Sequence, residues 1–401
     1  MNDPNHPTSP WTPAGAVRQL RDKIQRTSSE RIRLDQATGR ILSTSLTADR
    51  DSPAADVSAM DGYALRMQDL ANPGSLDVCG ESRPGHAPPS GSSQGIVRIF
   101  TGAIVPSEFD CVIRREETKE SATSITLRDS ARRAKHGDNI RRQAENISSG
   151  EVVLEAGTLL NAAAIAAAAN FGASQIEVQK QVRVSVIVTG DELQPVGQSV
   201  TPWQLRDSNG PTLQAMLIHR PDVHLHPVQR VIDSLPNIQT KLNQALAISD
   251  VVVFTGGVSM GDYDHVPAAV LACGGELVFH RVPLRPGKPI LAAVTKQGQL
   301  ILGLPGNPVS AAVGARRFLL PLLACFQGAV ERHPPAIPLV DPPSKTLPLW
   351  WLRLVKIDSQ GNANIVPGKG SGDLVALAAS DGFIEQPPEA SGPGPWTYWE
   401  W

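Results

Sequence analysis

Residues 250–264 constrain the fold of this chain more than any other stretch. The stretch begins with Val251, Val252, Val253 and Phe254, an uninterrupted apolar run that is typical of a strand buried on both faces. A turn rich in glycine follows at once, and from His265 an apolar segment is predicted to be a helix. This order points backbone N–H groups and a helix dipole at an anion. An anion-binding turn and an ordinary glycine-rich turn are both compatible with the stretch alone.

Two carboxylates, Asp262 and Asp264, stand at the end of this turn. They would repel a bare phosphate group, so an anion there is expected to come with a divalent cation or a hydrolytic step.

The length, net charge and cysteine content of the chain limit the classes of protein to which it can belong. A chain of 401 residues is too long for one hydrophobic core and predicts about two to four domains. The formal net charge of -2 predicts no binding of nucleic acid or of an acidic membrane surface. No run of eighteen apolar residues or secretory leader is apparent, and the four cysteines form no CxxC pair. A cytoplasmic protein without a membrane span is therefore expected.

Strands and helices alternate through residues 183–327, which predicts a central doubly wound α/β domain. Polar turns follow or adjoin the ends of its predicted strands, where ligands bind in such folds. We expect these turns to converge on one crevice: 189–192, 255–264, 285–288 and 305–308.

The flanking segments have a different character. Short strands punctuated by Gly and Pro predict a small β-domain before residue 128, and a helix is predicted over residues 150–172. After Pro334 the pattern predicts a compact C-terminal β-domain.

Seven separate segments of the chain form a recognisable series. They are Ser-Ala-Met-Asp-Gly-Tyr-Ala at 58–64, Arg-Ile-Phe-Thr-Gly-Ala at 98–103, Asn-Ile-Arg-Arg at 139–142, Thr-Gly-Asp-Glu at 189–192, Gly-Gly-Val-Ser-Met-Gly at 256–261, Lys-Pro at 288–289 and Leu-Pro-Gly-Asn-Pro-Val-Ser at 304–310. Each segment alone is a weak signal, but their order and number are specific. Together they resemble the molybdopterin molybdenumtransferase family (the MoeA family, which includes the E domain of gephyrin-like proteins).

The resemblance implies a multidomain α/β and β architecture. Residues 1–50 and 147–182 would form an elongated first domain, and residues 51–146 an inserted β-rich domain. Residues 183–327 would bind molybdopterin, and residues 333–401 would form a C-terminal domain like a β-barrel. Members of the family look like homodimers in which two subunits share a cleft.

The resemblance also implies a reaction. Adenylylated molybdopterin and molybdate would be the substrates, the pyrophosphate would be cleaved with release of AMP, and Mg²⁺ or another divalent cation would assist. Transient contacts with molybdopterin adenylyltransferase and with acceptor molybdoenzymes are implied as well.

Site residues follow from matching positions. Pyrophosphate contacts are expected from the N–H groups of Gly256, Gly257 and Ser259, with Arg285 and Lys288 as cations, and Lys288 counted as catalytic. Carboxylates expected to hold the metal or orient the attacking group are Asp61, Glu192 and Asp264. Other residues expected to bind or shape the substrate site are Thr101, Arg141 and Arg142 for molybdate, and Thr255, Gly261, Pro305, Pro308 and Ser371.

Three positions depart from the family pattern. Asn146 stands where an aspartate is usual, only Asp233 remains where paired aspartates are usual, and Arg285 replaces a lysine. These departures support one alternative, a non-catalytic molybdopterin-binding scaffold. A second alternative, molybdopterin adenylyltransferase, is disfavoured by the extra domains at 1–182 and 333–401, because those enzymes resemble the single α/β domain.

Overall fold

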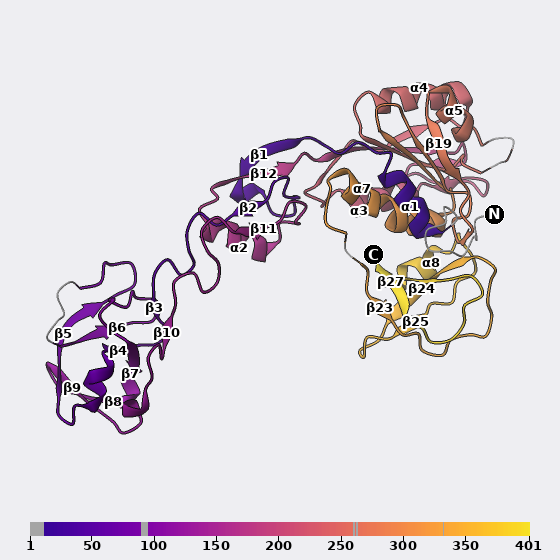
Figure 1. The fold of residues 1–401 in the computed structure, drawn as a ribbon. Helices are drawn as coiled ribbons and strands as arrows, with labels where there is room; N and C mark the ends of the chain where they lie inside the picture. The colour runs from indigo at the N-terminus through magenta and orange to yellow at the C-terminus, as the bar shows by residue number, and fades with distance from the viewer. Residues whose placement is uncertain (1–11, 90–94, 260, 262–263, 332) are drawn as a thin grey trace. The chain divides into compact units, whose positions relative to one another are not determined.

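The computed structural model describes residues 12–89, 95–259, 261, 264–331 and 333–401. Two compact units are present. The larger one contains residues 12–44, 156–165 and 174–401, and the smaller one contains residues 45–155 and 166–173. These units are coarser than the four predicted domains, whose boundaries stay predictions. Each unit is described separately below (Figure 1).

A seven-stranded sheet forms the centre of the larger unit. Its β-branched strands are buried on both faces, as the apolar run after Asp250 predicts. β13 pairs in parallel with β16, β17 and β18, and β18 pairs in parallel with β22, whereas β21 and β19 run antiparallel at the other edge. The strands are β13 (Val182–Thr189), β16 (Val223–Leu225), β17 (Gln229–Val231), β18 (Val251–Thr255), β19 (Glu276–His280), β21 (Leu291–Val294) and β22 (Leu300–Leu304).

Helices cover both faces of this sheet, which confirms the doubly wound α/β class (Figure 1). Val251 and Val253 of β18 pack on one face, and Val252 and Phe254 pack on the other. The first face carries α1 (Pro13–Arg21), α3 (Asn209–Leu217) and the continuous helix formed by α6 (Pro308–Gly314), the π-helical turn η5 (Ala315–Leu319) and α7 (Leu320–Phe326). The second face carries α4 (Leu235–Leu246) and α5 (Val266–Ala272).

The helix Pro308–Phe326 is long and apolar enough to cross a membrane by composition alone. However, 72% of its most apolar window is buried inside the fold, where it packs on the central sheet. It is a core helix of the α/β part.

A second sheet of the larger unit has six strands and one short helix beside it. Five of these strands, β23 to β27, come from the segment after Pro334, where the sequence pattern predicts strands. Its elements are β20 (Leu284–Arg285), β23 (Ala336–Ile337), β24 (Trp350–Ile357), β25 (Ala363–Ile365), α8 (Leu374–Ala378), β26 (Gly382–Gln386) and β27 (Trp396–Glu400).

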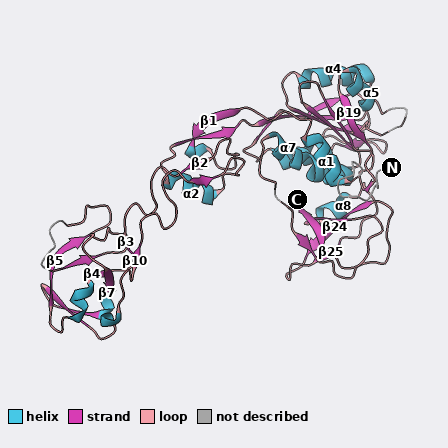
Figure 2. Cartoon of the chain, viewed as in Figure 1, coloured by secondary structure: helices cyan, strands magenta, loops and turns pink. Residues whose placement is uncertain are grey.

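The smaller unit is rich in strands, as predicted (Figure 2). One sheet has the strand order β7-β4-β6-β5-β9-β8, and two short pairs, β3 with β10 and β2 with β11, lie outside it. Its strands are β2 (Leu46–Thr47), β3 (Val57–Ser58), β4 (Gly62–Leu65), β5 (Leu76–Ser82), β6 (Ile96–Ile99), β7 (Cys111–Arg114), β8 (Thr118–Glu120), β9 (Ser124–Leu127), β10 (Ile140–Arg141) and β11 (Val152–Leu154), joined by 3-10 turns η2 (Met67–Ala71), η3 (Arg115–Glu117) and η4 (Ala131–Arg133).

The helix predicted over residues 150–172 is too long. Val152 and Val153 instead form β11, because β-branched residues pack well in a strand and β2 supplies a partner. The helix α2 begins only at Ala162 and ends at Asn170. The remaining elements are η1 (Leu34–Gln36), the pair β1 (Ser29–Arg33) with β12 (Gln175–Gln179), and the pair β14 (Leu193–Gln194) with β15 (Leu205–Arg206).

A buried ion pair joins the π-helical turn to the second sheet. Arg317 Nε donates to Glu385 Oε2 at 2.6 Å, and the two side chains are only 6% and 7% exposed. Trp399 Nε1 donates to the same carboxylate at 3.1 Å, and the Arg317 guanidinium lies 4.7 Å from the Trp399 ring centre.

Replacing Glu385 with Ala should destabilise this part of the protein by about 3–5 kcal/mol, because it leaves the Arg317 charge buried without its partner. Urea unfolding followed by tryptophan fluorescence measures the loss. The double variant R317M/E385L should lose less stability than E385A, because it removes both charges and leaves only the Trp399 Nε1–H without its acceptor. A loss for E385A no larger than that for the exposed control D35A would contradict a buried pair.

Candidate functional site

The turns predicted to converge lie at the point where the strand order of the central sheet reverses. β13 comes first in the chain, the next strands (β16 and β17) pair on one side of it, and β18 pairs on the other. Loops that leave two such neighbouring parallel strands diverge and open a crevice at their carboxyl ends. The turn at 189–192 and the turn that starts at Gly256 leave the sheet on the two sides of this point.

The two turns touch through backbone atoms. Gly256 has φ +90°, and a Cβ built on it would lie 2.4 Å from the carbonyl oxygen of Thr189. Gly257 has φ +62°, and its Cβ would lie 3.2 Å from Thr189 Cγ2. No side chain fits at Gly256, so this residue type is required by the close approach of the turns.

The N–H of Gly256, one of the three expected phosphate donors, already has an acceptor within the sheet. The N–H of Gly256 donates to Leu304 O at 3.1 Å, because the bonding between β18 and β22 continues one residue past the strand. Within the described residues, the N–H groups of Gly257 and Ser259 have no acceptor. These two are the donors that an anion can use. Asp262 lies outside the described residues.

Three aspartates gather beside the turn. Thr189 Oγ1 donates to Asp233 Oδ1 at 3.1 Å, and the backbone N–H of Asp233 donates to Asp191 Oδ1 at 3.0 Å. Burial raises the pKa of the Asp233 carboxyl, and the nearby charges of Asp191 and Asp264 raise that pKa further. Asp233 is therefore one member of a carboxylate group. Asp191 was missed by the sequence reasoning, although it belongs to the segment Thr-Gly-Asp-Glu.

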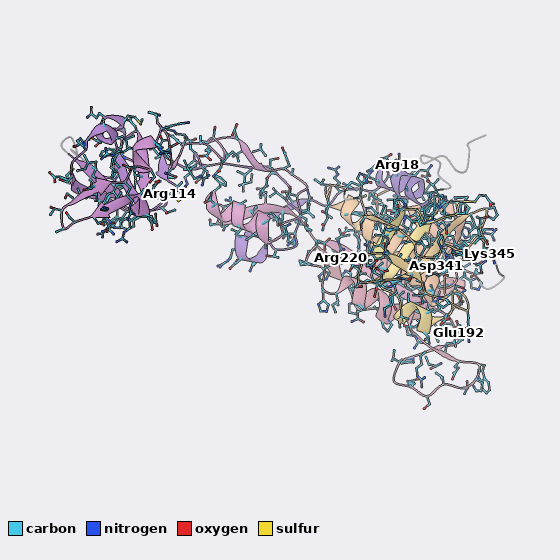
Figure 3. The ribbon with its side chains drawn as sticks, turned by 90° about the horizontal axis from the view of Figure 1, so that it is seen from below. Arg18, Arg114, Glu192, Arg220, Asp341 and Lys345 are labelled. Carbon is cyan, nitrogen blue, oxygen red and sulfur yellow. The ribbon has the colours of Figure 1, made fainter. Side chains whose placement is uncertain are left out.

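The other two predicted carboxylates of this unit have simpler surroundings. Asp264 Oδ2 accepts a hydrogen bond from the N–H of Gly261 at 2.7 Å, which holds the far end of the turn. Glu192 is exposed where the chain leaves the sheet (Figure 3).

These carboxylates fit a cation only in part. Among the described residues, no group of three or more His, Cys, Asp or Glu side chains could hold a metal ion. Of the three predicted ligands, Glu192 and Asp264 belong to the larger unit and Asp61 to the smaller one. Carboxylate oxygen is nevertheless the ligand type of Mg²⁺, which proteins usually hold through one or two carboxylates together with substrate phosphates. The donor chemistry fits Mg²⁺ that arrives with a phosphorylated ligand.

The cationic turn and the proline turn meet at the start of the core helix. A Cβ on Gly287 would lie 3.8 Å from Ser310 O, which places the exposed side chains of Arg285 and Lys288 on a turn next to that helix. Ser371 O accepts from the N–H of Val309 at 3.0 Å.

Pro305 and Pro308, the two prolines expected to shape the site, flank the turn between β22 and the core helix. Pro305 is buried directly after β22, and Pro308 begins α6. A Cβ on Gly306 would lie 3.6 Å from Gly256 Cα, so the turns 189–192, 255–264 and 305–308 lie next to one another, while the turn 285–288 adjoins the start of the core helix. That all four line one ligand crevice stays a prediction.

In the smaller unit, Asp61 and Thr101 lie together although 40 residues separate them. Asp61 Oδ1 accepts from both the N–H and the Oγ1–H of Thr101, each at 2.8 Å. These two bonds lower the pKa of Asp61, and the charges of Arg115 and Arg98 lower it further.

A cavity of about 40 Å³ adjoins Asp61. Arg115 pairs with Glu120 at 2.7 Å, and the Tyr63 hydroxyl donates to Glu120 at 2.9 Å. The sequence reasoning missed this lining, since its members come from separate strands and turns: Gly62, Tyr63, Arg98, Ile99, Phe100, Arg115 and Glu120.

Arg141 and Arg142, the two arginines expected to bind molybdate, already have hydrogen-bond or ion-pair partners. Arg141 donates to Asn146 Oδ1 at 2.7 Å, and Arg142 pairs with Asp56 at 2.5 Å. The pairing of β10 with β3, which sets Arg141 opposite Val57, brings these groups together. Both guanidinium groups thus already have partners, and their molybdate role stays a prediction.

Two family descriptions match the chain. The MoeA N-terminal region (domain I and II) matches residues 12–172, and the probable molybdopterin binding domain matches residues 185–324. The second match contains the whole crevice of the larger unit except the turn around Ser371.

Curated relatives agree with these matches. The molybdopterin molybdenumtransferase of Nostoc sp. is 34% identical over 345 residues, which is 82% of this chain and 78% of the relative. The molybdopterin molybdenumtransferase of Staphylococcus epidermidis is 31% identical over 93% of this chain and 90% of the relative.

A solved structure shares the fold along nearly the whole chain. The molybdopterin biosynthesis MoeA protein of Pyrococcus horikoshii superposes with a TM-score of 0.81 at 26% identity, covering 96% of this chain and 98% of the other. Sequence, family descriptions and structure agree: this chain belongs to the molybdopterin molybdenumtransferase family.

Proposed function

We propose that this chain inserts molybdenum from molybdate into adenylylated molybdopterin during molybdenum cofactor biosynthesis. The observation that carries the proposal is the turn at the strand reversal, where, among the described residues, the N–H groups of Gly257 and Ser259 have no acceptor and Asp233 lies beside Gly257. In the proposed reaction water cleaves the pyrophosphate linkage, so that AMP leaves and one phosphate stays on molybdopterin. Molybdenum then binds the two dithiolene sulfurs, and one molybdate oxygen leaves as water with the two thiol protons. The names of the relatives support a transferase, whereas the scaffold and adenylyltransferase alternatives are not favoured.

The polar site residues of the larger unit have separate roles in this proposal. The N–H groups of Gly257 and Ser259 hold the pyrophosphate oxygens, and Arg285 and Lys288 balance their charge. Asp264 and Glu192, one or both, would hold Mg²⁺ together with the substrate phosphates, and the cation would draw charge from the pyrophosphate. The packing of the turns against the core helix keeps these groups in place before substrate arrives.

The smaller unit would supply the molybdate side of the reaction. Thr101, Arg141 and Arg142 are proposed to bind the dianion, which requires the guanidinium groups to exchange Asn146 and Asp56 for molybdate oxygens. Asp61, held ionised by Thr101, would orient a donor or a cation there.

We further propose a cytoplasmic homodimer with a shared cleft, and transient contacts with the adenylyltransferase that supplies the substrate and with acceptor molybdoenzymes. Light scattering after size exclusion should give twice the chain mass of 42.8 kDa at micromolar concentration. A single-chain mass under those conditions would refute the homodimer.

The activity itself is tested with purified full-length chain, adenylylated molybdopterin, molybdate and MgCl₂. AMP release and reconstitution of a cofactor-free molybdoenzyme are expected. Lys288→Gln should raise the KM for adenylylated molybdopterin about ten- to a hundredfold, because it removes a charge-assisted contact. The matched control Lys345→Gln, an exposed lysine of the same unit, should behave like wild type. Tight substrate binding by wild type without AMP release would refute the proposal.

Thr101→Val should raise the pKa of Asp61, because it removes the side-chain hydrogen bond that favours the carboxylate. The backbone bond from residue 101 remains, so the pKa should stay below the ordinary aspartate value. Carboxyl ¹³C NMR titration of the full chain measures both. If Asp61 is needed as a carboxylate, the acid limb of AMP release moves to higher pH in T101V. An unchanged Asp61 titration would mean that the Thr101 hydroxyl does not stabilise the charge.

A further inference from the structure

Asn209 has no role in the site described above. It is the first residue of α3 and is 6% exposed. Its Nδ2–H donates to the carbonyl oxygen of Gly306 at 2.8 Å. Its Oδ1 is also buried, and no group of the described part of the chain hydrogen-bonds to it. The side chain is therefore a half-satisfied buried amide.

A buried acceptor without a partner costs stability, and an apolar side chain of the same size would avoid that cost. Such groups in native structures call for an explanation, which includes a water or ligand that completes the bonding. Stability of α3 does not supply the explanation, because Asp207 Oδ1 already accepts the N–H of Gly210 at 2.9 Å in the first turn.

The position of the Asn209 amide gives a reason for its buried oxygen to lack a partner among the described residues. Gly306 lies in the turn between β22 and α6, and a Cβ on it would be 3.6 Å from Gly256 Cα. Asn209 therefore links α3, which follows β13 in the chain, to the proline turn that lies against Gly256. The three segments are those that leave β13, β18 and β22 at their carboxyl ends. Thr255 Oγ1, at the end of β18, is a second buried polar atom without a partner.

We propose that Asn209 is a positioning residue for the substrate, an inference that rests on the proposed function. Its Nδ2–H holds the Gly306 turn in place, and its Oδ1 accepts a hydrogen bond from a ring N–H or amino group of the bound heterocycle, directly or through one water. The donor belongs to either the pterin or the adenine of adenylylated molybdopterin, since both rings carry such groups.

Two variants separate the parts of this role. Asn209→Leu removes both hydrogen-bonding atoms and keeps the branched shape with a somewhat larger side chain. Asn209→Asp keeps the shape but replaces the donor facing Gly306 O with an oxygen. Both should weaken binding of adenylylated molybdopterin about tenfold, measured by direct titration of the full chain and by the KM for AMP release. The Tm of N209L should stay within about 4 °C of wild type. The control Asn237→Leu, on α4, should change neither quantity.

A parallel titration with AMP identifies the ring. Weaker AMP binding in both variants places the donor on the adenine, and unchanged AMP binding with weaker binding of the whole substrate places it on the pterin. Wild-type binding of both ligands by N209L would overturn the proposal, and wild-type binding by N209D would overturn the role at Gly306. Failure of the proposed function is distinct, because it shows as absent AMP release in the wild-type chain, whereas the titrations do not depend on turnover.

Discussion

The larger unit depends on one close approach, that of Gly256 to the carbonyl oxygen of Thr189. At this point the ends of two parallel strands lie nearer than any side chain allows, since a Cβ would come within 2.4 Å of that oxygen. The turns can lie so close because β18 pairs with β13 on one side and with β22 on the other. The carboxyl ends of three neighbouring strands, β13, β18 and β22, are thereby held next to one another.

The close approach of Gly256 to Thr189 also places the Asp233 carboxylate next to the backbone of the glycine turn. Asp233 reaches Thr189 by hydrogen bond and lies near Gly257, so a carboxylate is held partly buried beside backbone N–H groups that attract anions. Its raised pKa shows that burial and neighbouring aspartates disfavour another negative charge there. A phosphorylated ligand that brings Mg²⁺ would satisfy both the carboxylates and the N–H groups, which is why the two kinds of group make sense together.

Prediction succeeded where the signal is local. The apolar run 251–254 was predicted as a strand and is β18, because β-branched residues with no polar interruption fit a doubly covered sheet. It failed over residues 150–172, where the partner strand β2 decides that Val152 and Val153 are extended. Glycine near a predicted strand end pointed to a tight turn, but nothing local to residue 256 indicates that Leu304 takes up its N–H.

The sequence by itself determined the family, the doubly wound class and the set of turns that form the crevice, because each is written in short segments or in a regular apolar pattern. Only the tertiary structure decided which of those groups are available. It engages Arg141 and Arg142 with Asn146 and Asp56 and joins Asp191 to Asp233. It leaves the side-chain oxygen of Asn209 without a partner among the residues that are described. The physical reason is that the availability of a polar group depends on its hydrogen-bond partners, and most of these partners come from distant parts of the chain.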